Sequence, residues 1–180
     1  MQEEKKFIEE LLNPKTQNQA FEILLKNFQK PLYNHIRNIV LNHDDTDDVL
    51  QNTFVKVFQN LDKFKGESKL FSWVYRIATN EALTFLNKKA KSGGVSSETL
   101  QNKTIDNLKA DLYFDGNEIQ IKLQRAIAIV PEKQQLVFKM KYFEELKYEE
   151  ISEILGTSVG ALKASYHIAV KKIESFVTTN

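Results

Sequence analysis

The sequence predicts an all-α fold of two small helical domains joined by a flexible linker. Apolar residues recur at steps of three and four over long stretches, the period of an amphipathic helix, and no strand-like alternation is persuasive. Only 6 Gly and 3 Pro occur among 180 residues, which favours helix. Residues 92–116 are instead rich in Ser, Asn, Thr, Asp and Gly, as expected of a linker with at most a transient turn of helix around Leu108–Leu112.

The first domain, residues 1–91, is expected to hold three main helices. Apolar spacing from Phe21 to Val40 predicts the first of them, with Pro31 as a point where it would kink. The run Asn42–Asp48 then supplies an amino-terminal cap and acidic residues for the first turn of a second helix, which ends near Phe64–Gly66.

The third helix is predicted to begin with Ser68 as its cap and to end at the stop signal Lys91–Gly94.

The second domain, residues 117–180, resumes helical spacing at Ile119. A further helix starts at Pro131, because proline suits the first position of a helix.

The chain ends in a helix-turn-helix pattern, Tyr148–Gly156 followed by Ser158–Lys172. In the last helix one apolar stripe faces the core, and small or basic residues remain outside, where they suit close approach to a major groove. An ordinary helical hairpin is the alternative interpretation. The residues expected at the cap and on the outer face are Ser158, Gly160, Lys163, Ala164, His167 and Lys171.

Positive charge is concentrated in two segments, although the formal net charge is only +1. Residues 63–91 carry 7 basic and 2 acidic side chains, a net of +5, and residues 157–180 carry 3 and 1, a net of +2. Attraction to phosphate explains such clusters. A solvated helix face would explain either cluster alone, so the nucleic-acid interpretation depends on their coincidence with helix motifs.

Several classes of protein and site are excluded. The chain has no cysteine, so it has neither disulfides nor thiolate zinc sites. Its start is acidic and no apolar run approaches bilayer length, so we expect a cytoplasmic protein without membrane insertion. The acidic run Asp44–Asp48 lacks the glycine and distal glutamate of a calcium loop, and the three histidines show no ligand spacing. We therefore expect no metal, no cofactor and no enzymatic activity.

Several motifs, each degenerate alone, become specific in their order and spacing. With them the chain resembles, over most of residues 20–91 and 119–175, the extracytoplasmic-function group of the sigma-70 family of bacterial RNA polymerase sigma factors. One departure is Lys163–His167, where family members often have an arginine-rich start, so no promoter sequence carries over. The motifs are Asp47–Phe58, Phe64–Gly66 with Trp73–Asn80, and Val130–Gln134 with Tyr148–Ile151.

The resemblance implies a division of labour between the two domains. Residues 1–91 would bind core RNA polymerase and capture the melted minus-ten element, and residues 117–180 would read the minus-thirty-five element as duplex through the outer residues of the last helix. An anti-sigma factor is a further implied partner. The implied polymerase contacts are Asp47, Asp48, Gln51, Phe54, Val55 and Phe58. The implied minus-ten contacts are Phe64, Lys65, Gly66, Lys69, Trp73, Arg76, Asn80, Thr84, Lys88, Lys89 and Lys91.

Residue chemistry is consistent with these roles. Asn80 offers both a donor and an acceptor to a base edge, and lysines can hold the phosphates of a single strand. The spacing of Trp73 suits packing as well as strand separation, and both interpretations stay open. Arg76 is expected either to contact phosphate or, preferably, to form an internal salt bridge with an acid of the preceding helix.

The function predicted is therefore that of a promoter-specificity subunit that directs core polymerase and promotes transcription initiation. Two alternatives are weighed. A conventional helix-turn-helix regulator would bind duplex DNA without recruiting polymerase, and a helical adaptor would bind a partner but no DNA.

Overall fold

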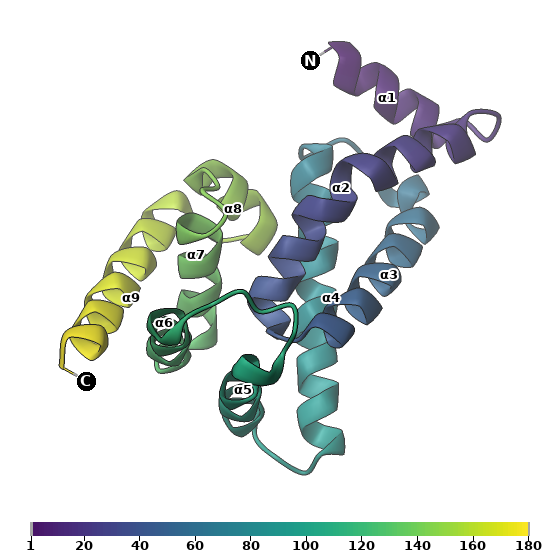
Figure 1. Cartoon of the computed structure of the whole chain (residues 1–180). Coiled ribbons are helices and arrows are strands. Elements are labelled where there is room, and N and C mark those ends of the chain that lie inside the picture. The colour runs from purple at the N-terminus through teal and green to yellow at the C-terminus, as the bar shows by residue number, and fades with distance from the viewer. Residues whose placement is uncertain (1, 180) are drawn as a thin grey trace.

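The computed structural model describes residues 2–179, which contain nine α-helices, two short 3-10 helices and no strand (Figure 1). The all-α prediction is confirmed. The α-helices are α1 Gln2–Leu12, α2 Gln17–Val40, α3 His43–Gln59, α4 Leu70–Ser92, α5 Ser97–Asp106, α6 Glu118–Ala128, α7 Glu132–Tyr142, α8 Tyr148–Leu155 and α9 Val159–Thr179. The 3-10 helices are η1 Leu61–Lys63 and η2 Leu108–Ala110.

The amino-terminal half is built on α2, α3 and α4, each of which packs against the other two. α3 begins as predicted, because the Asn42 side chain accepts a hydrogen bond from the backbone N–H of Asp45 at 2.9 Å. α2 continues through Pro31 as one helix of 24 residues. The predicted cap of the third helix is wrong: α4 begins after Lys69 without any side-chain cap, and Ser68 lies one residue outside that position.

α1 was not predicted from the sequence. It packs against α2 and η1, and Leu11 is its buried anchor. The turn into α2 is held by two side chains that bond back to carbonyls of α1: the Thr16 hydroxyl donates to Glu10 O at 2.8 Å, and the Gln17 amide donates to Leu11 O at 3.0 Å.

The segment predicted to be a flexible linker is more ordered than its composition indicates. It contains α5 and η2, whose Ile105 and Leu108 are buried in a small cluster with Leu41 and Ile121. The sequence did not show this, because its polar composition predicts a linker and the burial of Ile105 and Leu108 depends on other segments, such as Leu41, that fold against them.

Charge and stacking also tie the linker to the first half. Arg37 of α2 donates to the Asp111 carboxylate at 2.6 Å, and the Tyr113 ring stacks on His43 at 3.5 Å between centroids. The pKa of Asp111 is lowered, since hydrogen bonds from the Tyr113 backbone and from Arg37 outweigh the opposing effect of its burial.

The carboxyl-terminal half contains α6 to α9. α6 starts with a reciprocal capping box between Asn117 and Gln120, each side chain bonding the other's backbone N–H at 3.1 Å. α8 and α9 form the predicted helix-turn-helix, and Gly156 makes the turn between them with φ +65°. A left-handed backbone at this point favours glycine.

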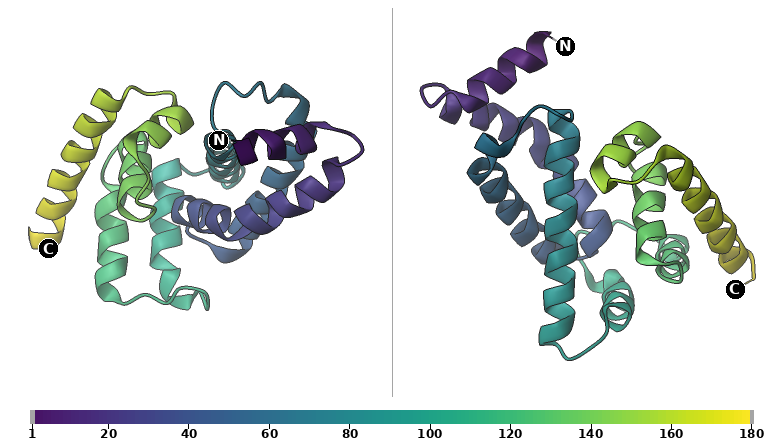
Figure 2. Two further views of the ribbon diagram at one scale, coloured as in Figure 1. Left: turned by 90° about the horizontal axis from the view of Figure 1, so that it is seen from above. Right: turned by 180° about the vertical axis from the view of Figure 1, so that it is seen from behind.

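The two halves pack against each other, as the views in Figures 1 and 2 agree. α8 lies against α4 and α7 against α2, and the core is continuous, since Met140 and Ile151 join the same buried cluster as Val74. His35 of α2 is completely buried at this junction. Its Nδ1 lies 2.9 Å from the Glu144 carboxylate and its Nε2 lies 2.8 Å from the Thr79 hydroxyl.

Candidate nucleic-acid interface

The first candidate surface is a polar stripe along α4. Residues four apart on a helix lie on one face, and the residues of this stripe follow steps of four, four, four and three. All five are exposed, and three of them are lysine or arginine, so the stripe suits a phosphate backbone. Its members are Arg76, Asn80, Thr84, Lys88 and Lys91.

The loop before α4 presents a mixed surface. Lys65, Gly66 and Lys69 are exposed, whereas Phe64 is only 6 % exposed and packs its ring against Trp73 at 5.1 Å between centroids. Trp73 is half-buried, so it packs against the core and still has exposed surface. Phe64 therefore packs beneath the surface against Trp73 and is too buried to contact a ligand itself.

Two cations predicted at this surface already have protein partners. Arg76 donates to the backbone carbonyl of Glu153 on α8, which corrects the expectation of a salt bridge with the preceding helix. Lys89 forms an ion pair with Asp45 at the start of α3, and its ammonium also lies 5.7 Å from the centre of the Phe85 ring. A nucleic acid would have to compete for both side chains.

The second candidate surface is the outer face of α9. Ser158 caps the helix, because its hydroxyl accepts a hydrogen bond from the Ala161 N–H at 3.3 Å. The predicted inner stripe is buried at Leu162, Ala169 and Ile173. The predicted outer residues Gly160, Lys163, Ala164, His167 and Lys171 are all exposed.

Lys163 places a positive charge beside the first turns of α9. Its ammonium lies 5.7 Å from the centre of the Tyr148 ring, where the face of the ring attracts a cation and positions it beside the helix start. The neighbouring residues Gly160 and Ala164 have small side chains, so the backbone of α9 can approach the major groove of DNA closely.

A third surface lies on α3. Val55 is 54 % exposed and Phe58 is 41 % exposed, and Asp48 and Gln51 on the same helix are exposed as well. Phe54 and Asp47 are half-buried. Phe58 also packs edge-on against Phe21 of α2 at 4.9 Å between ring centroids, so the face has a rigid support.

Other exposed or buried features were not found in the sequence. Tyr142 and Phe143 at the end of α7 are exposed aromatic residues, 54 % and 37 %, and no motif in the sequence marked them. His35 had no motif to mark it, since its partners Thr79 and Glu144 are remote in the chain. Only the tertiary structure brings these groups together.

Within residues 2–179 no group of histidine, cysteine or acidic residues is arranged to hold a metal ion. The same range contains no helix with the length and apolar character needed to span a bilayer.

The fold and these faces define an all-helical protein of two units, one a helical bundle with a basic helix and the other a helix-turn-helix. Two family models match the chain in succession. Sigma-70 region 2 matches residues 24–92, and sigma-70 region 4 matches residues 120–173. The chain belongs to the sigma-70 family, in its extracytoplasmic-function subfamily, as its curated relatives also indicate.

Two relatives illustrate the similarity. The chain is 27 % identical over 164 residues to the ECF RNA polymerase sigma-E factor of Haemophilus influenzae, covering 87 % of this chain and 86 % of the relative. It is 28 % identical over 156 residues to the ECF RNA polymerase sigma factor SigW of Bacillus subtilis, covering 82 % and 83 %.

Two solved structures share the fold. One is CnrH in complex with the cytosolic domain of CnrY, with a TM-score of 0.66, 19 % identity and coverage of 91 % of this chain and 90 % of that one. The other is the sigma factor RpoE in complex with the anti-sigma factor NepR from Bartonella quintana, with a TM-score of 0.65, 17 % identity and coverage of 89 % and 98 %.

Proposed function

We propose that this protein is an RNA polymerase sigma factor of the extracytoplasmic-function type, which binds core polymerase, recognises promoter DNA and promotes transcription initiation. The observation that carries the proposal is the succession of region 2 and region 4 along one chain, each with an exposed basic helix face on α4 or α9. A conventional regulator with one DNA-binding helix needs only the helix-turn-helix and has no need of region 2.

The α4 stripe suits the melted minus-ten element. Its lysines at 88 and 91 provide cations along a phosphate backbone, and Asn80 provides a donor and an acceptor to an unpaired base. The exposed part of Trp73 offers an aromatic surface at the end of the stripe for contact with a displaced base. We assign Lys65, Gly66, Lys69 and Thr84 to the same surface, with Phe64 as its buried support.

The outer face of α9 suits the minus-thirty-five element as duplex. Recognition helices contact bases near their amino-terminal turns, and here those turns carry Ser158, Gly160, Lys163 and Ala164. His167 and Lys171 follow one and two turns later, where they can reach the phosphates. We propose domain limits of 1–91 and 117–180, with residues 92–116 between them.

The α3 face suits a protein partner. Exposed Val55 and Phe58 beside Asp48 and Gln51 combine an apolar centre with a polar margin, the common anatomy of a protein interface. We assign core polymerase to this face and propose that an anti-sigma factor competes for it, in keeping with the anti-sigma complex among the similar structures. The protein would act in the cytoplasm and carry no enzymatic activity of its own.

Reconstituted transcription tests the proposal. Purified core polymerase should start at defined sites within a library of random promoters only when this protein is added. Core polymerase alone and core polymerase with an unrelated helix-turn-helix repressor are the controls. Duplex binding without any initiated transcript would favour a conventional regulator, and weak DNA binding even at low salt would favour a helical adaptor.

A further inference from the structure

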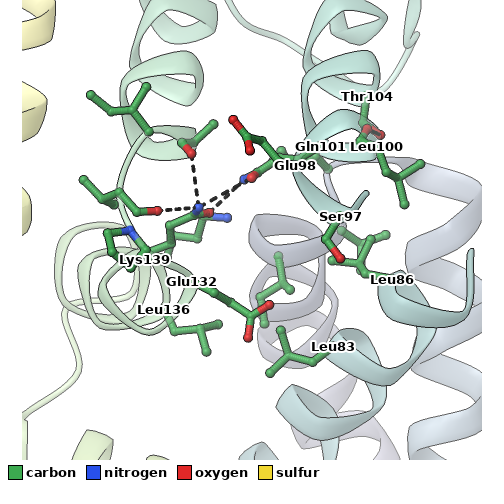
Figure 3. A pocket seen from close by; sticks show the side chains of 18 of the residues that line it. Leu83, Leu86, Ser97, Glu98, Leu100, Gln101, Thr104, Glu132, Leu136 and Lys139 are labelled. Carbon is green, nitrogen blue, oxygen red and sulfur yellow. Dashed lines mark hydrogen bonds between the residues drawn. The ribbon is translucent and has the colours of Figure 1, made fainter. Parts of the chain in front are cut away.

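A cavity of about 550 Å³ lies where the two halves and the linker meet. Figure 3 shows Leu83 and Leu86 of α4 on one side, Ser97 and Gln101 of α5 on another, and Lys139 of α7 opposite them. Small-molecule sites have volumes of roughly 300–1,000 Å³ and favour the junctions between domains, so size and position both suit a ligand. None of the functions proposed above uses this space.

The cavity combines apolar walls with polar groups fixed in orientation. Leu83, Leu86, Leu100 and Leu136 provide the apolar surface. The Gln135 amide is held by its hydrogen bond to Val130 O at 2.8 Å, and it also accepts from the Gln101 amide at 2.8 Å. Fixed polar groups within an apolar surround are the usual composition of a small-molecule site.

Lys139 is the group that calls for a ligand. The residue is only 3 % exposed, lines the cavity, and its ammonium makes no hydrogen bond or ion pair with the part of the chain that the structure describes. An ammonium has three donors, and burying them without acceptors is costly. Burial accordingly lowers the pKa of Lys139 to about 8, although the nearby carboxylates of Glu132 and Glu144 act to raise it.

The charges at the margin of the cavity do not cancel this preference. Glu98, Glu132 and Lys172 also line the cavity, but all three are exposed. The Glu144 side chain is only 10 % exposed and also acts on Lys139, but it does not line the cavity and its carboxylate lies 2.9 Å from His35 Nδ1. Water and salt screen exposed charges far more than a buried one, so an entering ligand feels Lys139 most strongly. A negatively charged group is the natural partner for it.

We propose that this cavity binds a small amphiphilic carboxylate, whose carboxylate pairs with Lys139 and whose apolar body lies against the leucines of α4, α5 and α7. Because residues of both halves line the cavity, the ligand would bridge them. The binding itself does not depend on the function proposed above and can be measured on the free protein.

The test is a titration of the full chain with octanoate and with octanol, followed by amide chemical shifts in nuclear magnetic resonance spectra. The two probes share an apolar chain and differ in charge. Octanoate should bind on the order of tenfold more tightly, as expected for a charge-assisted hydrogen bond in a buried site. The shifts should cluster at α4, α5 and α7.

Lys139→Met should remove the preference for octanoate and leave the affinity for octanol unchanged, which also shows that the cavity is intact. Lys133→Met removes the same charge from an exposed position on the same helix and should behave as the wild type. If Lys139→Met does not fold, Leu100→Phe narrows the cavity and should weaken both probes. Absence of binding, equal affinity of the wild type for both probes, or shifts that map elsewhere would overturn the proposal.

Discussion

Lys139 is a buried cation in a chain whose other lysines are mostly exposed, and its protonation couples to folding. Its pKa in the folded protein is about 8, below the usual 10.5. Between these values the unfolded chain keeps a proton that the folded protein has released, so stability rises with pH across that window and is flat below it. The full rise is about 3 kcal/mol, at 1.36 kcal/mol per pKa unit.

Denaturant unfolding of the wild type and of Lys139→Met at pH 7 to 10 checks this expectation. The variant should be the more stable at pH 7, and its advantage should shrink as the pH approaches 10. Burial raises the pKa values of Tyr75 and Tyr166, which affects the same range, but both proteins share that contribution. A constant difference across the range would show that Lys139 does not titrate there.

Asn80 lies exposed in the middle of the α4 stripe, and the structure gives it no partner that its loss would disrupt. Asn80→Ala should therefore impair open-complex formation by about 1–3 kcal/mol, the usual value of hydrogen bonds to a base edge, and leave stability and minus-thirty-five duplex binding unchanged. Permanganate footprinting and duplex binding measure the two effects. Asn102→Ala, on exposed α5, is the matched control, and equal loss in both assays would remove Asn80 from the strand-binding surface.

At the residue scale, the sequence could indicate exposure but not partners. The outer residues of α9 were predicted correctly as exposed, because helical periodicity fixes which side of a helix faces the core. Arg76 was expected to pair within its own half, yet its partner is the Glu153 carbonyl. Periodicity carries no information about which helix of another unit lies opposite a side chain.

Among the elements, the helix-turn-helix depends on the backbone of Gly156. This residue has φ +65° and nothing within 4 Å of the position that a Cβ would occupy, so the cost of Gly156→Ala is backbone strain alone, roughly 1–2 kcal/mol. Gly160 is helical and equally unobstructed, so Gly160→Ala should stabilise by about 0.4–1 kcal/mol. Thermal unfolding should show shifts of opposite sign, and two shifts of the same sign would contradict this explanation.

α9 is also the element on which the duplex prediction depends. Lys163→Ala should weaken binding to promoter duplex and, if its ammonium neutralises one phosphate, reduce the slope of log affinity against log salt by about 0.9. Lys103→Ala removes an exposed lysine from α5 and serves as the control. Fluorescence anisotropy at several salt concentrations measures both quantities. An unchanged slope with unchanged affinity would place Lys163 outside the interface.

Among the elements, features set by neighbouring residues were predicted from the sequence, and features set by remote residues were not. The caps of α3 and α9 were predicted because Asn42 and Ser158 bond within their own first turns. α5 was missed, because the polar composition of the linker hides two buried residues, Ile105 of α5 and Leu108 of η2, which pack with Leu41 just after α2 and Ile121 of α6. Short-range chemistry can be found in a sequence, whereas burial by distant segments cannot.

The two halves of the molecule pack against each other, with α8 against α4 and α7 against α2, an arrangement called closed below. Elements centred near minus ten and minus thirty-five lie about 25 base pairs apart, which is about 85 Å along the duplex at 3.4 Å per base pair. A compact domain of this length is roughly 40 Å across. If the two halves bind the two elements as proposed, the closed arrangement cannot contact both at once, and the halves would have to separate at a promoter.

The contacts that must break include Arg76 with Glu153 and His35 with Glu144. Under the proposed assignment Arg76 would then become available to nucleic acid, so opening the molecule would also complete the α4 surface. Removing the Glu144 carboxylate leaves the buried Nδ1 of His35 without its hydrogen-bond partner, although Nε2 keeps the Thr79 hydroxyl, and this destabilises the closed state. Glu144→Ala should therefore favour opening, whereas Glu149→Ala, at an exposed position on α8, should not.

Energy transfer between two dyes measures this separation, and the absence of native cysteine makes site-specific labelling straightforward. Gln59→Cys on α3 and Glu174→Cys on α9 are exposed positions in the two halves. Transfer should be high in the free protein, lower in Glu144→Ala, and lowest with core polymerase and promoter DNA. If a transcriptionally active complex kept the transfer of the free protein, separation of the halves would not be needed and the geometric argument would fail.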